Sequence, residues 1–181
     1  MDSRVAPARN KMICPDCRAE NIEGADVCEV CGSDLRNLKL PSPDSELEYA
    51  LTHDKLGELG AREALSVGAG DPVAFAVHLM RQKGVECLLV REGEKIVGIL
   101  TERDILMKAA GGKVDLNSLA VRAIMTPDPV MLREDDTLAV AVHKMSIGGF
   151  RHIPFLAKGR PTLLVSIQDV FRHVSPLIPH E

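Results

Sequence analysis

The chain of 181 residues is long enough for one average domain with a small appendage. Hydrophobic residues make up 45% of it, but no Trp, one Tyr and four Phe argue against binding bases or sugars on aromatic platforms. A formal net charge of -4 gives no broad attraction to nucleic acid or to an anionic membrane surface.

The N-terminus lacks the apolar run of a signal peptide, and no later stretch is long and apolar enough to span a membrane. We therefore expect a cytoplasmic protein without a membrane partner. In that reducing compartment, disulfides are not the expected state of the cysteines.

Four of the five cysteines form two Cys-x-x-Cys pairs: Cys14, Cys17, Cys28 and Cys31. Four thiolates at this spacing can surround one ion tetrahedrally, at about 2.3 Å each for zinc. Residues 10–37 resemble a short zinc ribbon, including Gly32, where a positive φ helps backbone N–H groups point at sulfur. We predict a structural Zn²⁺ site, because four protein ligands leave no open position. Iron in a rubredoxin-like site, a disulfide pair and a redox motif stay as alternatives.

The charge of the cysteine-containing segment indicates whether it contacts protein or nucleic acid. Over residues 1–40, seven acidic side chains outnumber six basic ones, and four thiolates around a divalent ion add two negative charges. A negative ribbon is a poor phosphate clamp, so contact with a protein is the better hypothesis than nucleic acid. A DNA-binding transcriptional regulator that uses the ribbon is the disfavoured alternative.

Residues 38–53 are predicted to be a linker and a leading helix. Ser45 followed by Glu48 is a capping box, and Leu47, Ala50 and Leu51 give the helix one apolar stripe. We expect this stripe to pack against the main domain.

The main domain consists of two copies of one sequence repeat. With an offset of 65 residues, positions 71–106 align with 136–171 without a gap, and eight of the 36 pairs are identical. The identical pairs are Asp71/Asp136, Ala74/Ala139, Ala76/Ala141, Val77/Val142, His78/His143, Met80/Met145, Gly84/Gly149 and Asp104/Asp169.

Each copy is predicted to contain a helix that starts after Asp71 or Asp136, as the capping residue, and stops at Gly84 or Gly149. Two β-type runs with a turn between them then predict a hairpin. A closing helix follows, with Thr101 or Ser166 as its N-cap, and a short apolar strand precedes each copy (residues 65–67 and 130–132).

The order in each copy is therefore β-α-β-β-α. Neither copy can bury both faces of a three-stranded sheet alone, so we predict an α+β fold with two pseudo-symmetric repeats packed sheet to sheet. The repeats are assigned to residues 54–112 and 113–175. Such a pair has two equivalent clefts.

This order, the run GILTERD at residues 98–104 and the run MTPDPV at residues 125–130 resemble a pair of CBS domains, or Bateman module. The resemblance covers residues 54–175. It implies a regulatory protein, not an enzyme, that binds AMP, ADP or ATP in the clefts, pairs into a homodimer and acts on an unidentified protein target. An assembly adaptor with vestigial clefts is the alternative.

The hydroxyl-x-x-aspartate turns explain such binding chemically. A helix N-terminus offers unpaired N–H groups to an anion, while Asp104 or Asp169, one turn in, presents a carboxylate to the ribose hydroxyls. Thr101 and Ser166 offer a hydroxyl to ribose or phosphate. The same pattern also fits a plain capping box.

The two copies differ at positions that the family uses for phosphate. The second copy has Arg151 and His152, where the first has Glu86 and Cys87, and a carboxylate repels phosphate. We therefore predict that the cleft of Ser166 and Asp169 is the better nucleotide site. Arg151 is the expected phosphate ligand, and His152 is a second, pH-sensitive ligand.

Two departures from the family pattern qualify this prediction. Leu163 replaces the glycine seen at Gly98, which permits close backbone approach, and is expected to narrow the second site. Arg62 stands where the second copy has Pro127 and is a candidate phosphate ligand. The matched His78 and His143 are expected to pack at the pseudo-symmetric interface between the repeats and not to bind metal.

Overall fold

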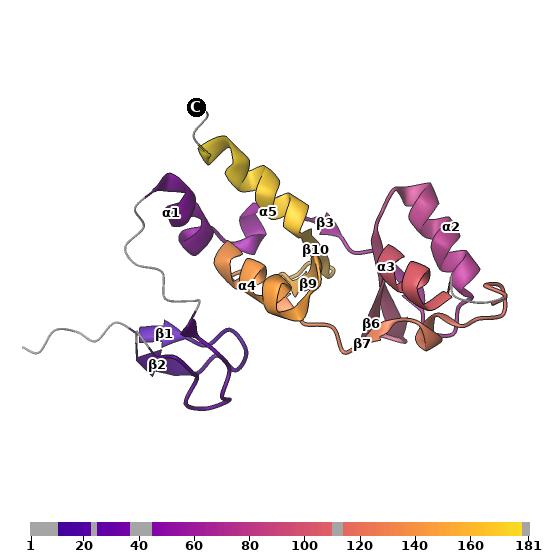
Figure 1. Cartoon of the computed structure of the whole chain (residues 1–181), viewed down its shortest axis with the longest axis horizontal. Coiled ribbons are helices and arrows are strands. Elements are labelled where there is room, and N and C mark those ends of the chain that lie inside the picture. Colours follow the sequence, from indigo (N-terminus) through magenta and orange to yellow (C-terminus); the bar gives the residue numbers. More distant parts are fainter. Residues whose placement is uncertain (1–10, 23–24, 37–44, 110–113, 179–181) are drawn as a thin grey trace, which may run out of the picture.

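The computed structural model describes residues 11–22, 25–36, 45–109 and 114–178 (Figure 1). Along the chain these residues form a small cysteine-containing module, a leading helix and two α+β repeats. The linker predicted at the start of residues 38–53 lies outside the described residues. Within these ranges, every helix is too short or too polar to cross a lipid bilayer.

The cysteine module comprises residues 11–22 and 25–36. Strands β1 (Lys11–Ile13) and β2 (Glu20–Ile22) form an antiparallel hairpin, and Val27 and Asp34 form a single β-bridge. Its buried centre consists of Cys14, Cys28 and Leu35. This core is smaller than an independently folding domain usually has.

Helix α1 (Glu46–His53) begins where the sequence predicts, because the Ser45 side chain accepts a hydrogen bond from the backbone N–H of Glu48. Ala50 is buried, and Leu47 and Leu51 pack on the core of the second repeat. The packing prediction is thus confirmed, although α1 precedes the first repeat in sequence. At the end of α1, the Asp54 carboxylate lies 2.7 Å from His173 Nε2 in the last helix. A 3-10 turn (Leu56–Glu58) follows.

Each repeat contains a four-stranded sheet. The first has the order β4 (Ser66–Gly68), β5 (Cys87–Glu92), β6 (Lys95–Thr101) and β7 (Thr126–Pro127). The second has the order β3 (Arg62–Glu63), β10 (Leu163–Ser166), β9 (His152–Leu156) and β8 (Leu132–Arg133). In both sheets the first strand of the repeat proper runs parallel to its neighbour and the hairpin is antiparallel.

The fourth strand of each sheet comes from the other repeat. Strand β3 lies near the start of the first repeat but pairs with β10 of the second, and β7 lies near the start of the second repeat but pairs with β6 of the first. The sequence predicts only three strands per repeat. These exchanged strands were missed because two residues are too few to show an alternating pattern.

The first helix of each repeat is α2 (Val73–Lys83) or α4 (Leu138–Gly148), and each ends at the predicted glycine with positive φ. The predicted capping role of Asp71 and Asp136 is wrong. The N-caps are Pro72 and Thr137, and only Thr137 uses its side chain. Each aspartate instead accepts the backbone N–H of the residue three positions earlier, at 2.7 and 2.8 Å, and so closes the turn before the helix.

The closing helices start at the predicted N-caps. In the first repeat, α3 (Glu102–Asp104) continues as a π-helical turn (Ile105–Ala109), and in the second, α5 (Ile167–Val174) continues as a 3-10 turn (Ser175–Leu177). A further 3-10 turn (Val121–Ala123) leads into β7.

Separate aliphatic cores fill the two repeats, and a smaller cluster joins the sheets. Cys87, Leu89 and Ile99 of the first sheet pack with Leu164 of the second. The predicted α+β fold is confirmed. Burial raises the pKa of the Cys87 thiol to about 12, as expected of a core residue.

Gly98 shows how closely the exchanged strand approaches. A Cβ atom at this position would lie 2.5 Å from the Met125 sulfur and 3.1 Å from the Thr126 carbonyl oxygen. Gly98 therefore makes room for the segment that enters β7. Its counterpart Leu163 is buried in the second core.

We expect Gly98→Ala to lower the free energy of unfolding by about 1–3 kcal/mol, because the added methyl group overpacks the contact with β7. Gly70→Ala is the matched control, since its nearest neighbour would lie 3.9 Å from the new Cβ. Urea unfolding of both variants measures the effect. Equal stabilities of the two variants would contradict this account of Gly98.

Candidate functional site

The four clustered cysteines come together as the sequence predicts. All four Sγ atoms lie within 4.8 Å of one another, with 3.6 Å between Cys14 and Cys31 and 3.5 Å between Cys17 and Cys28. Ligands about 2.3 Å from a tetrahedral ion lie about 3.8 Å apart. The cluster therefore fits a single tetrahedral metal ion.

The two cysteine pairs have the same backbone form. The N–H of Arg18 donates to the Cys14 carbonyl and the N–H of Gly32 donates to the Cys28 carbonyl, both at 2.9 Å. Gly32 has the predicted positive φ of 74°, and Arg18 at the equivalent place has a φ of 63°. Sequence reasoning missed Arg18, because an arginine gives no sign of a left-handed backbone.

Hydrogen bonds favour the thiolate form on one side of the cluster. The backbone N–H of Cys31 lowers the pKa of the Cys28 thiol to about 6, and Ser33 lowers the pKa of Cys31. The buried Asn21 amide also donates to the Cys28 sulfur, at 3.6 Å. Asn21 was not singled out from the sequence. Thiolates with such donors are suited to metal ligation.

The first cysteine pair also contacts the second repeat. Arg18 Nη2 lies 3.1 Å from the Asp136 carboxylate, which is 5% exposed, and Asp16 pairs with Lys144 on α4. Burial raises the pKa of Asp136. The cysteine module thus lies against the start and middle of α4.

The matched histidines show that only one repeat is covered in this way. His143 is buried and interacts electrostatically with Asp16 and Asp34 of the cysteine module, whereas His78 is exposed. The prediction that both histidines pack between the repeats is therefore wrong, because His143 is buried beside the cysteine module and His78 is exposed. The identity of the pair in sequence did not reveal what packs on each helix.

A cavity of about 360 Å³ lies between the two repeats. Residues of α3, of the segment around β7 and of the turn between α4 and β9 line it together. The lining residues are Glu86, Ile99, Thr101, Glu102, Arg103, Asp104, Thr126, Asp128, Pro129, Val130, Gly148, Gly149, Phe150, Arg151 and His152.

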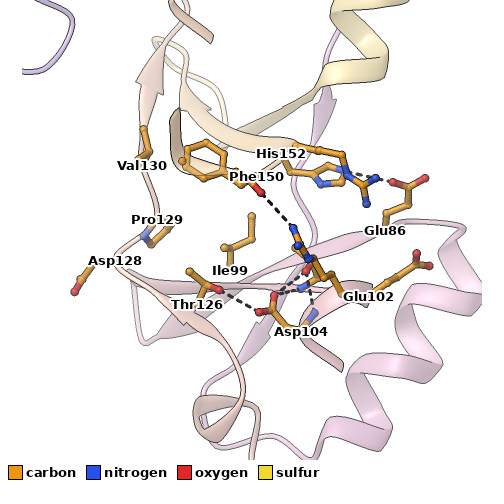
Figure 2. A pocket seen from close by; sticks show the side chains of 15 residues that line it. Glu86, Ile99, Glu102, Asp104, Thr126, Asp128, Pro129, Val130, Phe150 and His152 are labelled. Atoms are coloured by element: carbon orange, nitrogen blue, oxygen red, sulfur yellow. Dashed lines mark hydrogen bonds and ion pairs between the residues drawn. The ribbon is translucent and has the colours of Figure 1, made fainter. Parts of the chain in front are cut away.

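The turn of the first repeat supplies an aspartate to this cavity (Figure 2). Asp104 Oδ2 accepts from the backbone N–H and the hydroxyl of Thr101, at 3.0 and 2.7 Å. Asp104 Oδ1 accepts from the Thr126 hydroxyl at 3.1 Å and lies 3.4 Å from Lys108 Nζ. Thr126 and Lys108 were not predicted as site residues. Thr126 belongs to the MTPDPV run, but its partner is visible only once β7 joins the sheet.

The turn of the second repeat forms the same capping box, but different residues contact its aspartate. Asp169 Oδ2 accepts from the backbone N–H and hydroxyl of Ser166, and Asp169 Oδ1 accepts from Arg172 at 3.0 Å. Ser166 and Asp169 do not line the cavity. Both turns are thus capping boxes, and only the first opens into the cavity.

Arg151 and His152, predicted to serve the Ser166 turn, line the cavity of Thr101 and Asp104. His152 is also the strand partner of Ser166 and interacts electrostatically with Asp169. The start of β9 lies where the repeats meet, so its side chains reach the turn of the other copy. Arg62, the other candidate phosphate ligand, lies exposed in β3 and does not line the cavity.

Several charged groups line the cavity. His152 Nε2 lies 3.4 Å from the Glu86 carboxylate, and burial lowers the pKa of His152. Arg103 Nη1 donates to the Gly149 carbonyl at 3.3 Å, so a residue of the first repeat reaches the second across the cavity. Sequence reasoning did not single out Arg103.

Comparison with known proteins matches the CBS domain family at residues 56–111 and 121–176. The CBS domain-containing protein CBSCBSPB3 of Arabidopsis thaliana is 36% identical over 92 residues, which cover 51% of this chain and 16% of the plant protein. The chain spans between 16% and 24% of the length of five such plant proteins.

Solved structures show the same fold. The CBS-domain containing protein ATU1752 from Agrobacterium tumefaciens has a TM-score of 0.61 at 25% identity, over 66% of this chain and 98% of that chain. The hexameric CBS-CP12 protein from bloom-forming cyanobacteria has a TM-score of 0.58 at 25% identity, over 65% and 66% of the two chains.

We expect the purified protein to carry one metal ion per chain, and Cys28→Ser to lose it, because three thiolates hold a tetrahedral ion less tightly than four. Cys87→Ala is the matched control, since Cys87 lies in the core far along the chain from the cluster. Native mass spectrometry with elemental analysis measures the ion. A metal that Cys28→Ser retains, or that Cys87→Ala loses, would contradict the four-cysteine site.

Proposed function

Because the chain belongs to the CBS domain family, we propose that it is a non-catalytic regulatory protein whose cavity between the repeats binds an adenine nucleotide. The match covers both repeats, and regulation by a bound ligand requires no reacting groups. The nucleotide is of the AMP, ADP or ATP type.

The observation that carries this proposal is the combination of apolar, carboxylate and guanidinium groups in one cavity. Ile99, Pro129, Val130 and Phe150 provide an apolar end for a base, and Asp104 lies next to it. Arg103 and Arg151 line the same cavity and are the candidate phosphate ligands. A volume of about 360 Å³ falls within the usual range of small-molecule sites.

Asp104 is the expected ribose ligand. One carboxylate oxygen is held by Thr101, so the carboxylate is oriented before any ligand arrives. The other oxygen, bonded to the Thr126 hydroxyl, can exchange that partner for a ribose hydroxyl. Orientation by the capping box lowers the entropic cost of binding.

We expect wild-type protein to bind at least one of AMP, ADP, ATP and S-adenosylmethionine in isothermal titration. Asp104→Asn should weaken binding about tenfold to a hundredfold, because it removes a charge-assisted hydrogen bond to ribose. Asp169→Asn is the matched control, since it alters an equal capping box outside the cavity. If Asp169→Asn weakens binding as much as Asp104→Asn, the assignment of the site to this cavity is wrong.

For the cysteine module we propose a structural zinc ribbon, with Cys14, Cys17, Cys28 and Cys31 as ligands. Zinc suits four thiolates and would supply stability without redox chemistry. Residues of the first cysteine pair contact the second repeat, so the protein contact made by the ribbon includes its own chain. The metal would keep this pair in the form that contacts α4.

We expect Arg18→Gln to lower the free energy of unfolding by about 1–3 kcal/mol, because it leaves the buried Asp136 carboxylate without its guanidinium partner. Arg36→Gln is the matched control, since Arg36 is exposed and pairs with Asp34 inside the module. Urea unfolding of the metal-loaded protein compares them. Equal midpoints for the two variants would contradict a stabilising contact with the second repeat.

We further propose that the protein assembles as a homodimer. The closing helices expose Leu106 and Phe171, which occupy matched positions of the two repeats and are 67% and 62% exposed. One related protein of known structure is a hexamer. The subunit count from native mass spectrometry tests this assembly, and a monomer at micromolar concentration would exclude it.

A further inference from the structure

The cavity assigned to the nucleotide is lined by more carboxylates than guanidinium groups. Figure 2 shows Glu86, Glu102 and His152 on one side of Asp104, away from the apolar residues. The backbone N–H of Glu102 donates to the Glu86 carbonyl at 3.2 Å, so the two acidic residues are held next to each other. Arg103 and Arg151 line the same cavity, and Arg151 interacts electrostatically with His152.

The histidine adds little positive charge at neutral pH. Its side chain is 11% exposed, and burial lowers the pKa of His152 despite the opposing effect of Glu86. The charged residues that act on the His152 ring are Glu86, Arg151, Asp169 and Glu102. Four carboxylates (Glu86, Glu102, Asp104 and Asp128) and two guanidinium groups (Arg103 and Arg151) line the cavity, which therefore has no net positive charge for a chain of phosphates.

The guanidinium groups are also limited in number. Arg103 already donates to the Gly149 carbonyl, whereas the Arg151 guanidinium makes no hydrogen bond or ion pair with any residue in the described ranges. One arginine is thus available without rearrangement. A single phosphate, with about -1.5 to -2 charges at pH 7, matches one or two guanidinium groups.

We propose that Glu86 and Glu102 limit the cavity to adenosyl ligands with at most one phosphate, so that AMP binds in preference to ATP. This inference rests on the proposed nucleotide function of the same cavity. Each further phosphate adds negative charge beside the two carboxylates, and like charges at close range repel each other.

Isothermal titration of AMP and ATP, without divalent cations and at fixed ionic strength, tests the proposal. Wild-type protein should bind AMP at least about tenfold more tightly than ATP. The double variant Glu86→Gln with Glu102→Gln should reduce this ratio several-fold, mainly by strengthening the binding of ATP. Both side chains are substantially exposed, so glutamine at these positions preserves the fold.

The matched control is Glu94→Gln, which removes an exposed carboxylate at the far end of the β5–β6 hairpin. It should leave the ratio unchanged. Equal affinities of wild-type protein for AMP and ATP, or an unchanged ratio in the double variant, would overturn the inference while nucleotide binding stands. Absence of binding by both nucleotides would instead overturn the proposed function.

Discussion

The exchange of two short strands is the constraint on which the rest of the structure depends. Strand β3 completes the sheet of the second repeat, and β7 completes the sheet of the first. Because each sheet needs hydrogen bonds from a segment that leads into the other repeat, neither repeat is complete alone. The segment after β7 then forms one wall of the cavity. The cavity between the repeats is therefore a consequence of strand pairing.

The same exchange makes two similar turns unequal. Thr101 with Asp104 and Ser166 with Asp169 form the same capping box. Strand β7 brings Thr126 against Asp104, whereas Asp169 meets Arg172 of its own helix. A repeat in sequence preserves the local hydrogen bonds, which span three residues. It does not preserve the residues that contact each aspartate from outside the turn, because these residues differ between the two repeats.

The cysteine module breaks the symmetry in a second way. It covers part of α4 and buries His143, while the equivalent His78 stays in contact with solvent. Its contacts to Asp136 and Lys144 come from residues that flank a metal ligand. The end of α4 reaches the cavity through Gly148 and Phe150. One helix thus contacts both the proposed metal-binding module and the proposed nucleotide site.

Sequence alone determined the features that depend on local spacing: the α+β repeat, the ends of α2 and α4 at Gly84 and Gly149, the caps at Thr101 and Ser166, and the four-cysteine cluster. Helix caps and the turns of the Cys-x-x-Cys pairs are made by residues a few positions apart, so the sequence alone predicts them. Only the tertiary structure decided which groups share the cavity. It placed Arg151 and His152 with Asp104, because the start of β9 lies against the opposite repeat. The exchange of strands β3 and β7 determines which repeat β9 contacts. Each of these strands has only two residues, which are too few to show a pattern in the sequence.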